Sequence, residues 1–532
     1  MSDSYYPSVQ VSERLFRPAS ATSQTTTTSA AFIGRSSQGP VTPTLVTSWA
    51  SFTTLFGTDY TDLHMAVNDF FGNGGRQAYI TRIAGANAVP ADLDVFDSLA
   101  PNTSGTPLFT VTATSPGVWG NNLRLVTYLR DQTNKRFDVA LFRVPTGTTF
   151  DPAKRNTEYL VDQWIDVTLN PSSSRYLYSI ANAPSATGSQ LVTFAGQSYN
   201  PATPAVQPMP STVVGGNVFG VSPGTAGVDG IYTTPYTEST AYAAALASYE
   251  TFNGPFILNL PGVTTPGTIK DAITTAAARG DMFVVVDTAA GLTPAAALTF
   301  LNTDLNLSAL GGNVASFAAV YYPHVHMPAI GSGIPGRTVL RPPGGALAGL
   351  MMSTDVTVGP WKAPAGLTAS IAGAVAPERL LTAADLTSLN NNHINAIRSI
   401  RGAGIVVMGA RTTKKSGLDR YVNVRRTVME ITETLKASTQ FAIFENNDER
   451  LWGRVAAVCS RYLGTVWQAG GLRGNGPGEA FYVKCDGSNN TPATIEQGAV
   501  NVEVGIAPLT PAEFVIISIG QYDGGAEATV RI

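Results

Sequence analysis

The chain contains 532 residues, of which 44% are hydrophobic and 13% are charged. This length predicts about three or four domains, and because globular domains usually carry about 25% charged residues, we expect Ser, Thr, Asn and Gly to cover much of the surface. The 34 basic and 37 acidic residues give a formal net charge of −3. A charge this small provides no overall field to hold a polyanion, which argues against nucleic acid as a direct partner.

Neither a signal peptide nor membrane insertion is expected. The N-terminal sequence has no basic region followed by an apolar stretch. The longest apolar runs, such as 283–286 and 514–517, are far shorter than the about 20 residues that a membrane-spanning helix needs. We therefore expect a protein made in the cytoplasm, where Cys459 and Cys485 stay reduced.

Both ends of the chain carry strand signals. Val9 and Val11 alternate with polar residues in the manner of a strand, and a Ser/Thr-rich stretch at 19–29 follows them. Near the other end, the continuous apolar run at 514–517 also predicts a strand. Because an exposed strand this apolar promotes aggregation, we expect each end to pair with the edge of another sheet.

Three patterns follow one another between the two ends. Residues 31–83 alternate strand and helix signals, and residues 88–210 show the short alternating runs of an all-β region. Residues 211–375 return to Ala-rich helical stretches separated by apolar runs such as 283–286, which indicate buried parallel strands. The sequence therefore predicts a multidomain protein of mixed α/β and β structure.

The last part of the chain contains the clearest helix patterns. The first predicted helix has Asp419 as its N-cap and carries apolar residues at Val424, Val428, Ile431 and Leu435. The second carries Leu451, Val455, Val458 and Tyr462 at the same spacing. Each pattern is typical of a helix that packs one apolar face against a core.

A glycine-rich segment at 331–338 is one substitution away from a phosphate-binding P-loop. A P-loop needs a helix to begin directly after its glycines, because the helix N-terminus binds the phosphate. Here Arg337 replaces the lysine, and Pro342 and Pro343 follow within a few residues, so such a helix would end in its first turn. We therefore interpret the segment as a Gly/Pro-rich loop.

The segment at 220–224 matches the G-x-S-x-G nucleophile elbow of hydrolases, with Ser222 in the position of the nucleophile. That elbow uses the backbone N–H after the serine to stabilise an oxyanion. Pro223 has no N–H group, so the sequence favours a turn rather than a catalytic serine.

Three further residues were weighed as ligands or catalytic groups. His324 and His326 would share one face of a strand, as metal ligands can, but no third ligand is evident, so ordinary edge or loop histidines are favoured. Asp287 follows an apolar strand, where a single carboxylate is usually a cap or turn residue. We therefore predict no catalytic residue, no metal site and no cofactor.

Ten further segments carry no chemical motif, but their order along the chain is distinctive. In chain order these segments are AAFIGRSSQGP, LVTSWASFTTLFG, AVNDFFGNGGRQAYITRI, SPGVWGNNLRL, RPPGGALAGLMMSTDVTVGPWKAPAG, RGAGIVVMGART, DRYVNVRRTVMEI, FENNDERLWGRV, GEAFYVKCD and AEFVIISIGQ, which extend from residue 30 to residue 521. Together they resemble the tail sheath proteins of contractile-tailed bacteriophages and of related injection devices.

This resemblance implies a conserved α+β polymerisation domain built from N- and C-terminal segments, with an inserted β-sandwich or barrel domain and an inserted α/β domain of subtilisin-like architecture. The boundaries expected are an N-terminal arm at 1–25, the conserved inner domain at 26–88 and 376–505, the β domain at 89–210, the α/β domain at 211–375, and a C-terminal arm at 506–532. The subtilisin likeness concerns architecture only, because fold does not imply activity.

The resemblance also implies a mechanism. The terminal arms exchange strands between neighbouring copies by β-augmentation, and the residues expected to pair are Val9, Val11, Phe514, Ile516 and Ser518. Stacked rings then form a helical homopolymer around a tail tube protein, bounded by a baseplate and a tail terminator. Contraction from a kinetically trapped packing drives the tube through the host envelope. The expected location is a virion tail assembled in the host cytoplasm.

One predicted helix face is a candidate contact with the tube or with a neighbouring copy. It carries Arg425, Arg426, Glu430 and Glu433. The alternative is a solvated face stabilised by pairs such as Arg426 with Glu430. Both interpretations are left open by the sequence.

Two other classes of protein compete with a sheath. A hydrolase would need a base and an acid near Ser222, and neither could be assembled from the sequence. An adhesive appendage would also suit a Thr/Ser/Gly-rich surface, but it predicts a trimeric fibre instead of a wide tube. Within the sheath class, the sequence does not separate a bacteriophage tail from a bacteriocin-like particle or an extracellular injection system.

Overall fold

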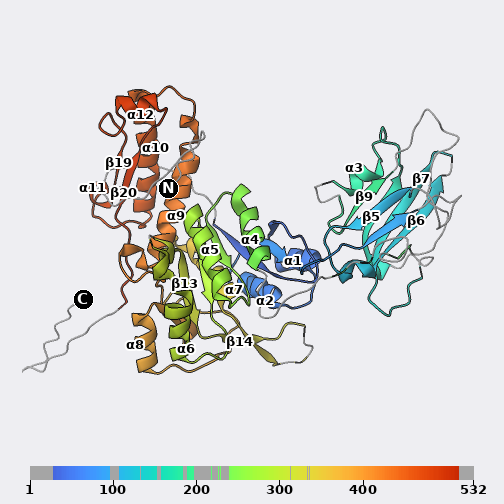
Figure 1. Ribbon diagram of the computed structural model, residues 1–532, viewed down its shortest axis with the longest axis horizontal. Coiled ribbons are helices and arrows are strands. Elements are labelled where there is room, and N and C mark those ends of the chain that lie inside the picture. The colour runs from blue at the N-terminus through green and yellow to red at the C-terminus, as the bar shows by residue number, and fades with distance from the viewer. Residues whose placement is uncertain are drawn as a thin grey trace, which may run out of the picture.

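The computed structural model describes residues 28–95, 107–131, 133–151, 157–183, 188–196, 217–218, 226, 228, 239–311, 313–331, 334 and 336–513. These residues form three parts, which Figure 1 shows as a central α/β body, a β unit set apart on one side of it and a helical unit at one end. The mixed α/β multidomain architecture expected from the sequence is confirmed.

The α/β body is built on an eight-stranded sheet with the strand order β18-β17-β13-β12-β11-β1-β3-β2. The strands of this sheet are β1 (Ser29–Arg35), β2 (Thr44–Val46), β3 (Ala78–Ile83), β11 (Phe256–Asn259), β12 (Met282–Asp287), β13 (Ala318–Tyr322), β17 (Ile394–Ile400) and β18 (Gly404–Val407). The central strands pair in parallel, whereas β2 and β18 are antiparallel edge strands. All residues of β12 and β13 are buried, which is why these strands read as continuous apolar runs.

Helices and a small second sheet complete the body. The helices are α1 (Trp49–Phe56), α2 (Asp62–Gly72), α4 (Ser239–Ala247), α5 (Pro266–Arg279), α6 (Pro294–Thr299), α7 (Gly344–Thr357) and α8 (Ala383–Asn391), and the second sheet contains β14 (Val325–Pro328), β15 (Thr338–Arg341) and β16 (Ala376–Pro377). α2 packs on α7, and Gly345 and Gly349 allow this close approach because a Cβ at Gly345 would lie 2.2 Å from the carbonyl oxygen of Ala66.

This sheet contains strands from segments that we assigned to different domains. We expected residues 26–88 to group with 376–505 and to be separate from 211–375. Instead, β1 is hydrogen-bonded to β3 on one side and to β11 on the other, and β17 extends the same sheet from β13. One sheet therefore contains strands from both predicted domains, because a parallel strand as apolar as β1 needs neighbours on both edges and cover on both faces. The domain boundaries themselves stay a prediction.

The β unit lies between β3 and α4 in the chain. Its elements are β4 (Asp92–Val95), β5 (Phe109–Ala113), β6 (Leu123–Asp131), β7 (Arg136–Arg143), β8 (Leu160–Val167), α3 (Leu177–Ala181), β9 (Val192–Gly196) and β10 (Asn217–Val218). Two antiparallel sheets, β10-β6-β7-β8 and β4-β5-β9, enclose a separate hydrophobic core. Within it, the rings of Trp164 and Phe194 meet edge to face with centroids 5.1 Å apart.

One buried arginine joins the β unit to the α/β body. The side chain of Arg82, at the end of β3, is 1% exposed. Its Nε donates to the carbonyl oxygen of Ser36 at 2.6 Å, and its Nη1 donates to that of Pro116 at 2.6 Å. Arg82 therefore links backbone on both sides of the boundary between the two parts.

The helical unit follows the body. It contains α9 (Val422–Ser438), α10 (Glu449–Gln468), α11 (Pro477–Ala480), β19 (Phe481–Lys484), α12 (Pro492–Glu496) and β20 (Glu503–Ile506). Apolar residues of α9 and α10 pack against β19 in a third core, so the two amphipathic helices expected from the sequence are confirmed.

The predicted cap of the first helix is wrong. α9 begins after Tyr421 and has no side-chain cap, whereas Asp419 lies in the preceding 3₁₀ turn, η9 (Leu418–Arg420). The Asp419 carboxylate instead accepts from Lys414 at 2.7 Å and from Arg425 at 3.4 Å. α10 is capped in the ordinary way, because Asp448 accepts from the backbone N–H of Leu451 at 2.9 Å.

Candidate functional site

Asp287 is a structural anchor at the carboxyl end of β12. Its Oδ1 accepts from the backbone N–H of Gly344, the first residue of α7, at 2.8 Å, and its Oδ2 accepts from Asn259 Nδ2 at 2.9 Å. Burial raises the pKa of Asp287, against the opposing effects of Asn259 and His324. The interpretation of this residue as a cap is confirmed, because its carboxylate satisfies an N–H group at the start of a helix.

The two histidines occupy different environments. His324 is buried, and its Nε2 lies 2.8 Å from the carbonyl oxygen of Thr288, whereas His326 on β14 is half-buried. Within the described ranges, no group of three or more His, Cys, Asp and Glu side chains has the arrangement to hold a metal ion.

The glycine-rich segment at 331–338 connects β14 to β15, which pair as an antiparallel hairpin. A strand therefore follows the glycines, and the next helix, α7, begins only at Gly344, after Pro342 and Pro343. This order differs from the strand, loop and helix that a P-loop requires. Ser222 and the rest of the segment at 220–224 lie outside the described residues.

The charged residues of α9 are turned largely towards the protein interior. Arg425 is 3% exposed, Arg426 5% and Glu433 8%. The guanidinium of Arg425 lies over the ring of Phe317, 4.4 Å from its centroid, and Glu433 accepts from Lys436 at 2.5 Å. The solvated helix face that we considered for Arg425 and Arg426 is therefore wrong, because both arginines are packed against the body.

Arg426 pairs with Asp355 of α7 rather than with Glu430. Its Nη1 donates to Asp355 Oδ1 at 2.9 Å, and its Nη2 donates to Oδ2, so the contact is bidentate. Burial raises the pKa of Asp355, although Arg426 and a hydrogen bond from Thr28 lower it. This pair ties the helical unit to the body beside the first described residue of the chain.

A cavity of about 460 Å³ lies at this boundary, and we call it the seam cavity. Its lining comes from the residues just before β1 and β3, from α7 and the loop after it, and from α9 and α10. Trp361 and Val466 are among its apolar residues. Glu430 also lines it, and no hydrogen bond joins the Glu430 carboxylate to the residues that the structure describes. Burial raises the pKa of Glu430 to about 7, and the neighbouring charge of Asp355 adds to the increase.

Among the described residues, the helical unit also contains a two-stranded sheet. β19 and β20 pair antiparallel from Phe481 with Ile506 to Lys484 with Glu503. Phe481 is buried against α10, so one face of the pair is covered. A two-stranded sheet is marginally stable by itself, and its outer edges can accept further strands.

The two ends of the described chain are held by charged contacts. Thr28 hydrogen-bonds Asp355, as noted above, and at the other end Arg411 Nε donates to Glu513 Oε1 at 2.8 Å. The residues predicted to exchange strands, which are Val9, Val11, Phe514, Ile516 and Ser518, lie outside the described residues. Strand exchange therefore stays a prediction.

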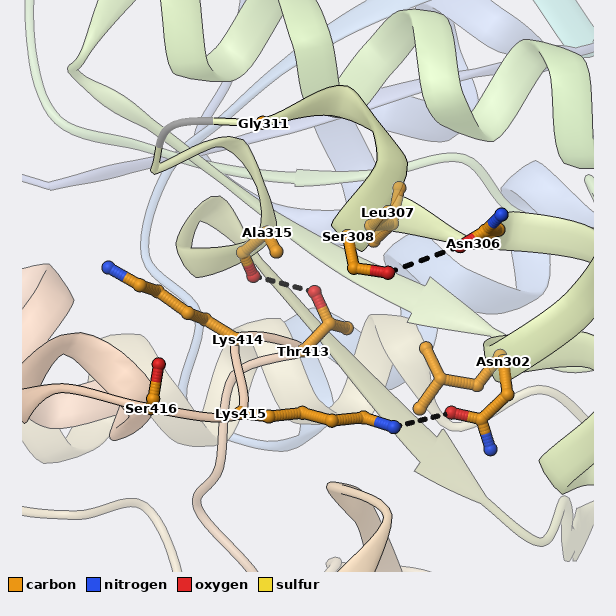
Figure 2. Close-up of a pocket in the computed structure, with 11 residues that line it drawn as sticks. Asn302, Asn306, Leu307, Ser308, Gly311, Ala315, Thr413, Lys414, Lys415 and Ser416 are labelled. Atoms are coloured by element: carbon orange, nitrogen blue, oxygen red, sulfur yellow. Dashed lines mark hydrogen bonds between the residues drawn. The ribbon is translucent and has the colours of Figure 1, made fainter.

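A second cavity, of about 570 Å³, lies beside the loop at 413–416, and we call it the loop cavity (Figure 2). Its wall opposite this loop comes from the π-helix η6 (Phe300–Leu305) and the 3₁₀ helix η7 (Leu307–Leu310). Lys415 Nζ donates across it to Asn302 Oδ1 at 2.8 Å, and Lys414 Nζ donates to Asp419. No local sequence pattern indicates this cavity, because residues on its opposite walls, such as Asn302 and Lys415, are 113 positions apart in the chain.

Membrane insertion receives no support from the helices. Every helix among the described residues is too short or too polar to traverse a bilayer.

Comparison with known proteins defines the class of this fold. Residues 417–521 match the family model of the phage tail sheath C-terminal domain. This match includes α9, α10 and the β19–β20 pair. No curated protein sequence matches the chain.

Solved sheath structures share the fold over nearly the whole chain. The contracted helical sheath of the anti-feeding prophage is 20% identical, covers 98% of this chain and 100% of its own, and superposes with a TM-score of 0.55. A baseplate structure of the same particle is 19% identical over 98% and 100%, with a TM-score of 0.55. A sheath tail protein from Listeria innocua is 13% identical over 88% and 90%, with a TM-score of 0.56.

These comparisons confirm the resemblance on which the sequence interpretation rests. The chain has the fold of sheath proteins, and residues 417–521 match the phage tail sheath C-terminal domain.

Proposed function

We propose that the chain is the structural subunit of a contractile sheath, which polymerises helically around a tube and contracts to drive that tube through a cell envelope. The observation that carries this proposal is the sheath-domain match at 417–521, supported by a sheath fold over 98% of the chain. The role is mechanical rather than catalytic, since Asp287, the acid best placed for catalysis by the sequence, anchors a helix instead.

Neighbouring copies are joined by strand exchange. We propose that the β19–β20 pair receives strands from the terminal arms, with Val9, Val11, Phe514, Ile516 and Ser518 as pairing residues. Two features support this proposal: the pair is too small to be a stable sheet by itself, and the C-terminal arm begins directly after β20. Added strands contribute main-chain hydrogen bonds and fill the open edges.

Contraction requires two packings of different free energy and no nucleotide. The extended sheath is the kinetically trapped packing, and each subunit releases free energy when it rearranges. Among the four residues of α9 predicted as contacts, Glu430 lines the seam cavity, so we retain it as the candidate for contact with a neighbouring copy or with the tube.

Two biological settings fit this function. In a bacteriophage, the sheath belongs to the virion tail, lies between a baseplate and a tail terminator, and serves genome delivery. In an extracellular injection system or a bacteriocin-like particle, the same contraction drives the tube through a cell envelope, but no genome is delivered. The similarity to sheath structures of the anti-feeding prophage is the reason to keep the injection system as an alternative to the bacteriophage tail.

The test is direct observation of the polymer. Purified full-length chain, concentrated in physiological buffer, should form wide hollow tubes that are visible by negative-stain electron microscopy. Trimeric fibres, or a chain that stays monomeric at every concentration and in the presence of its tube protein, would exclude the sheath function.

A further inference from the structure

An aromatic side chain projects into solvent from the connection between α9 and α10. Phe444 is 89% exposed, and its backbone φ is +64°. Residues with a Cβ adopt this conformation only at a cost in free energy, and strained positions of this kind concentrate where a protein binds something. The fold therefore holds an apolar ring in solvent in a backbone conformation that costs free energy.

A carboxylate accompanies this ring. Glu445 is also exposed, and its one salt-bridge partner in the described chain is Arg454, at 3.5 Å and half-exposed itself. Such an exposed pair is weak and easily exchanged for another. We call Phe444 and Glu445 the knob, because they present an apolar group and a negative charge on adjacent residues.

The loop cavity has the complementary chemistry. Leu301, Leu307 and Ala315 form a small apolar floor within an otherwise polar lining. The volume of about 570 Å³ lies within the range of about 300–1,000 Å³ that is typical of sites for small ligands. Lys415 is exposed at its rim and hydrogen-bonds the neutral Asn302, with no carboxylate of the described chain in ion-pair contact (Figure 2). The Lys415 ammonium group is therefore able to form an ion pair with a carboxylate of another molecule.

We propose that the knob of one copy docks in the loop cavity of a second copy. The ring of Phe444 packs on Leu301, Leu307 and Ala315, and the Glu445 carboxylate pairs with Lys415. The contact joins two different surfaces of the same chain, so it is heterologous and links copies head to tail in a ring or in an open helical series. This inference rests on the proposed function and identifies one surface by which the sheath assembles.

Charge distinguishes the loop cavity from the seam cavity as the receptor. The seam cavity is also partly apolar, but Asp355 and Glu430 line it together, with Arg426 paired to the first of them. Arg76 is the basic residue of its lining. Glu445 would lie close to the carboxylates of Asp355 and Glu430, which repel a further negative charge at short distance. The loop cavity instead offers an amine without a carboxylate partner.

Site-directed crosslinking tests the contact independently of tube formation. A Glu445→Cys chain is mixed with a Lys415→Cys chain and treated with a short bismaleimide, while the native Cys459 and Cys485 are buried. We expect a crosslinked dimer from this mixture and none when Lys362→Cys, another exposed lysine position, replaces Lys415→Cys.

The crosslink and the tubes are separate readouts. Tubes without the crosslink would overturn the docking and leave the sheath function intact. The crosslink without tubes would support the docking and remove the sheath function, and the absence of both would remove both.

Variants of the two partners test the chemistry of the contact. Phe444→Ala should raise the concentration at which tubes form by at least about tenfold, since truncating an aromatic anchor costs more than other contacts do. Leu380→Ala, at another exposed apolar position, should leave it unchanged. Glu445→Lys and Lys415→Glu should each weaken assembly, and the double variant should restore it. Equal effects of Phe444→Ala and Leu380→Ala, or no restoration by the double variant, would refute the assigned pairing.

Discussion

Arg426 of α9 and Asp355 of α7 form a bidentate, buried ion pair that joins the helical unit to the α/β body. The two side chains are 5% and 7% exposed. The Arg426 guanidinium lowers the pKa of both Asp355 and Glu430, so one positive charge stabilises two carboxylates at the boundary between these parts.

Arg426→Met should strongly destabilise the packing of the helical unit. It leaves the Asp355 carboxylate buried without its partner, and breaking a buried pair in this way costs about 3–5 kcal/mol. Urea unfolding followed by tryptophan fluorescence measures the loss, since Trp361 and Trp452 lie in or beside this unit. Arg454→Met, which removes an exposed pair with Glu445, is the control and should cost at most about 1 kcal/mol. If the two variants lose the same free energy of unfolding, the buried pair stabilises the protein no more than the exposed pair does.

Glu430 should make the protein less stable as the pH rises. Its pKa is about 7 in the folded chain and near 4.5 when unfolded, so the folded state binds the proton more tightly. The stabilisation is complete below pH 4.5 and is lost as the pH rises through 7, with a total on the order of 3 kcal/mol. Comparison of Glu430→Gln with the parent chain between pH 4 and 8 isolates this contribution, because other titrating groups are common to both. Parallel stability profiles would contradict the assignment.

Gly344→Ala should damage the anchor between β12 and α7. A Cβ at this position would lie 2.2 Å from Asn259 Nδ2 and 2.5 Å from Asp287 Oδ2, so the hydrogen bonds to Asp287 must shift. We expect a loss of about 1–3 kcal/mol or more in thermal unfolding. Gly267→Ala in α5 is the matched control, because its Cβ would meet no atom within 4 Å and should be neutral or stabilise by up to about 1 kcal/mol. The prediction fails if both alanines have the same effect.

Deletion of residues 1–20 should abolish polymerisation and leave a folded monomer. The deleted segment contains Val9 and Val11, which are predicted to pair with a neighbouring copy, whereas the described core begins at β1. Circular dichroism and size-exclusion chromatography verify the folded monomer, and negative-stain microscopy measures the tubes. Tubes of normal length from this variant would contradict strand exchange by the N-terminal arm.

The sequence predicted elements whose signal is local. The spacing of Leu451, Val455 and Tyr462 identified α10, and the apolar run at 283–286 identified β12, because each pattern reflects burial of a single element. The role of Asp287 as a cap was also predictable, since a carboxylate at the end of a strand commonly serves a neighbouring N–H group.

Relationships between distant segments were not predictable in the same way. β1 pairs with β11, although the whole β unit lies between them in the chain. The alternation of apolar and polar residues within a strand does not indicate which distant strand it pairs with. Arg426 has an acid four residues away in Glu430, but its partner is Asp355, 71 residues earlier in the chain. The loop cavity was missed for the same reason, because its lysines meet walls supplied by η6 and η7.

The position of β1 in the middle of the sheet sets the order in which the protein can fold during synthesis. β1 pairs with β3 soon after both leave the ribosome, but its other edge pairs with β11, which follows roughly 200 residues later. At about 5–20 residues per second, that apolar edge waits on the order of 10–40 s for its partner. During this interval the inserted β unit can close its own core, while β1 presents an open strand edge to other nascent chains. The molecule thus passes through an aggregation-prone stage on the way to its monomer, well before any controlled assembly begins.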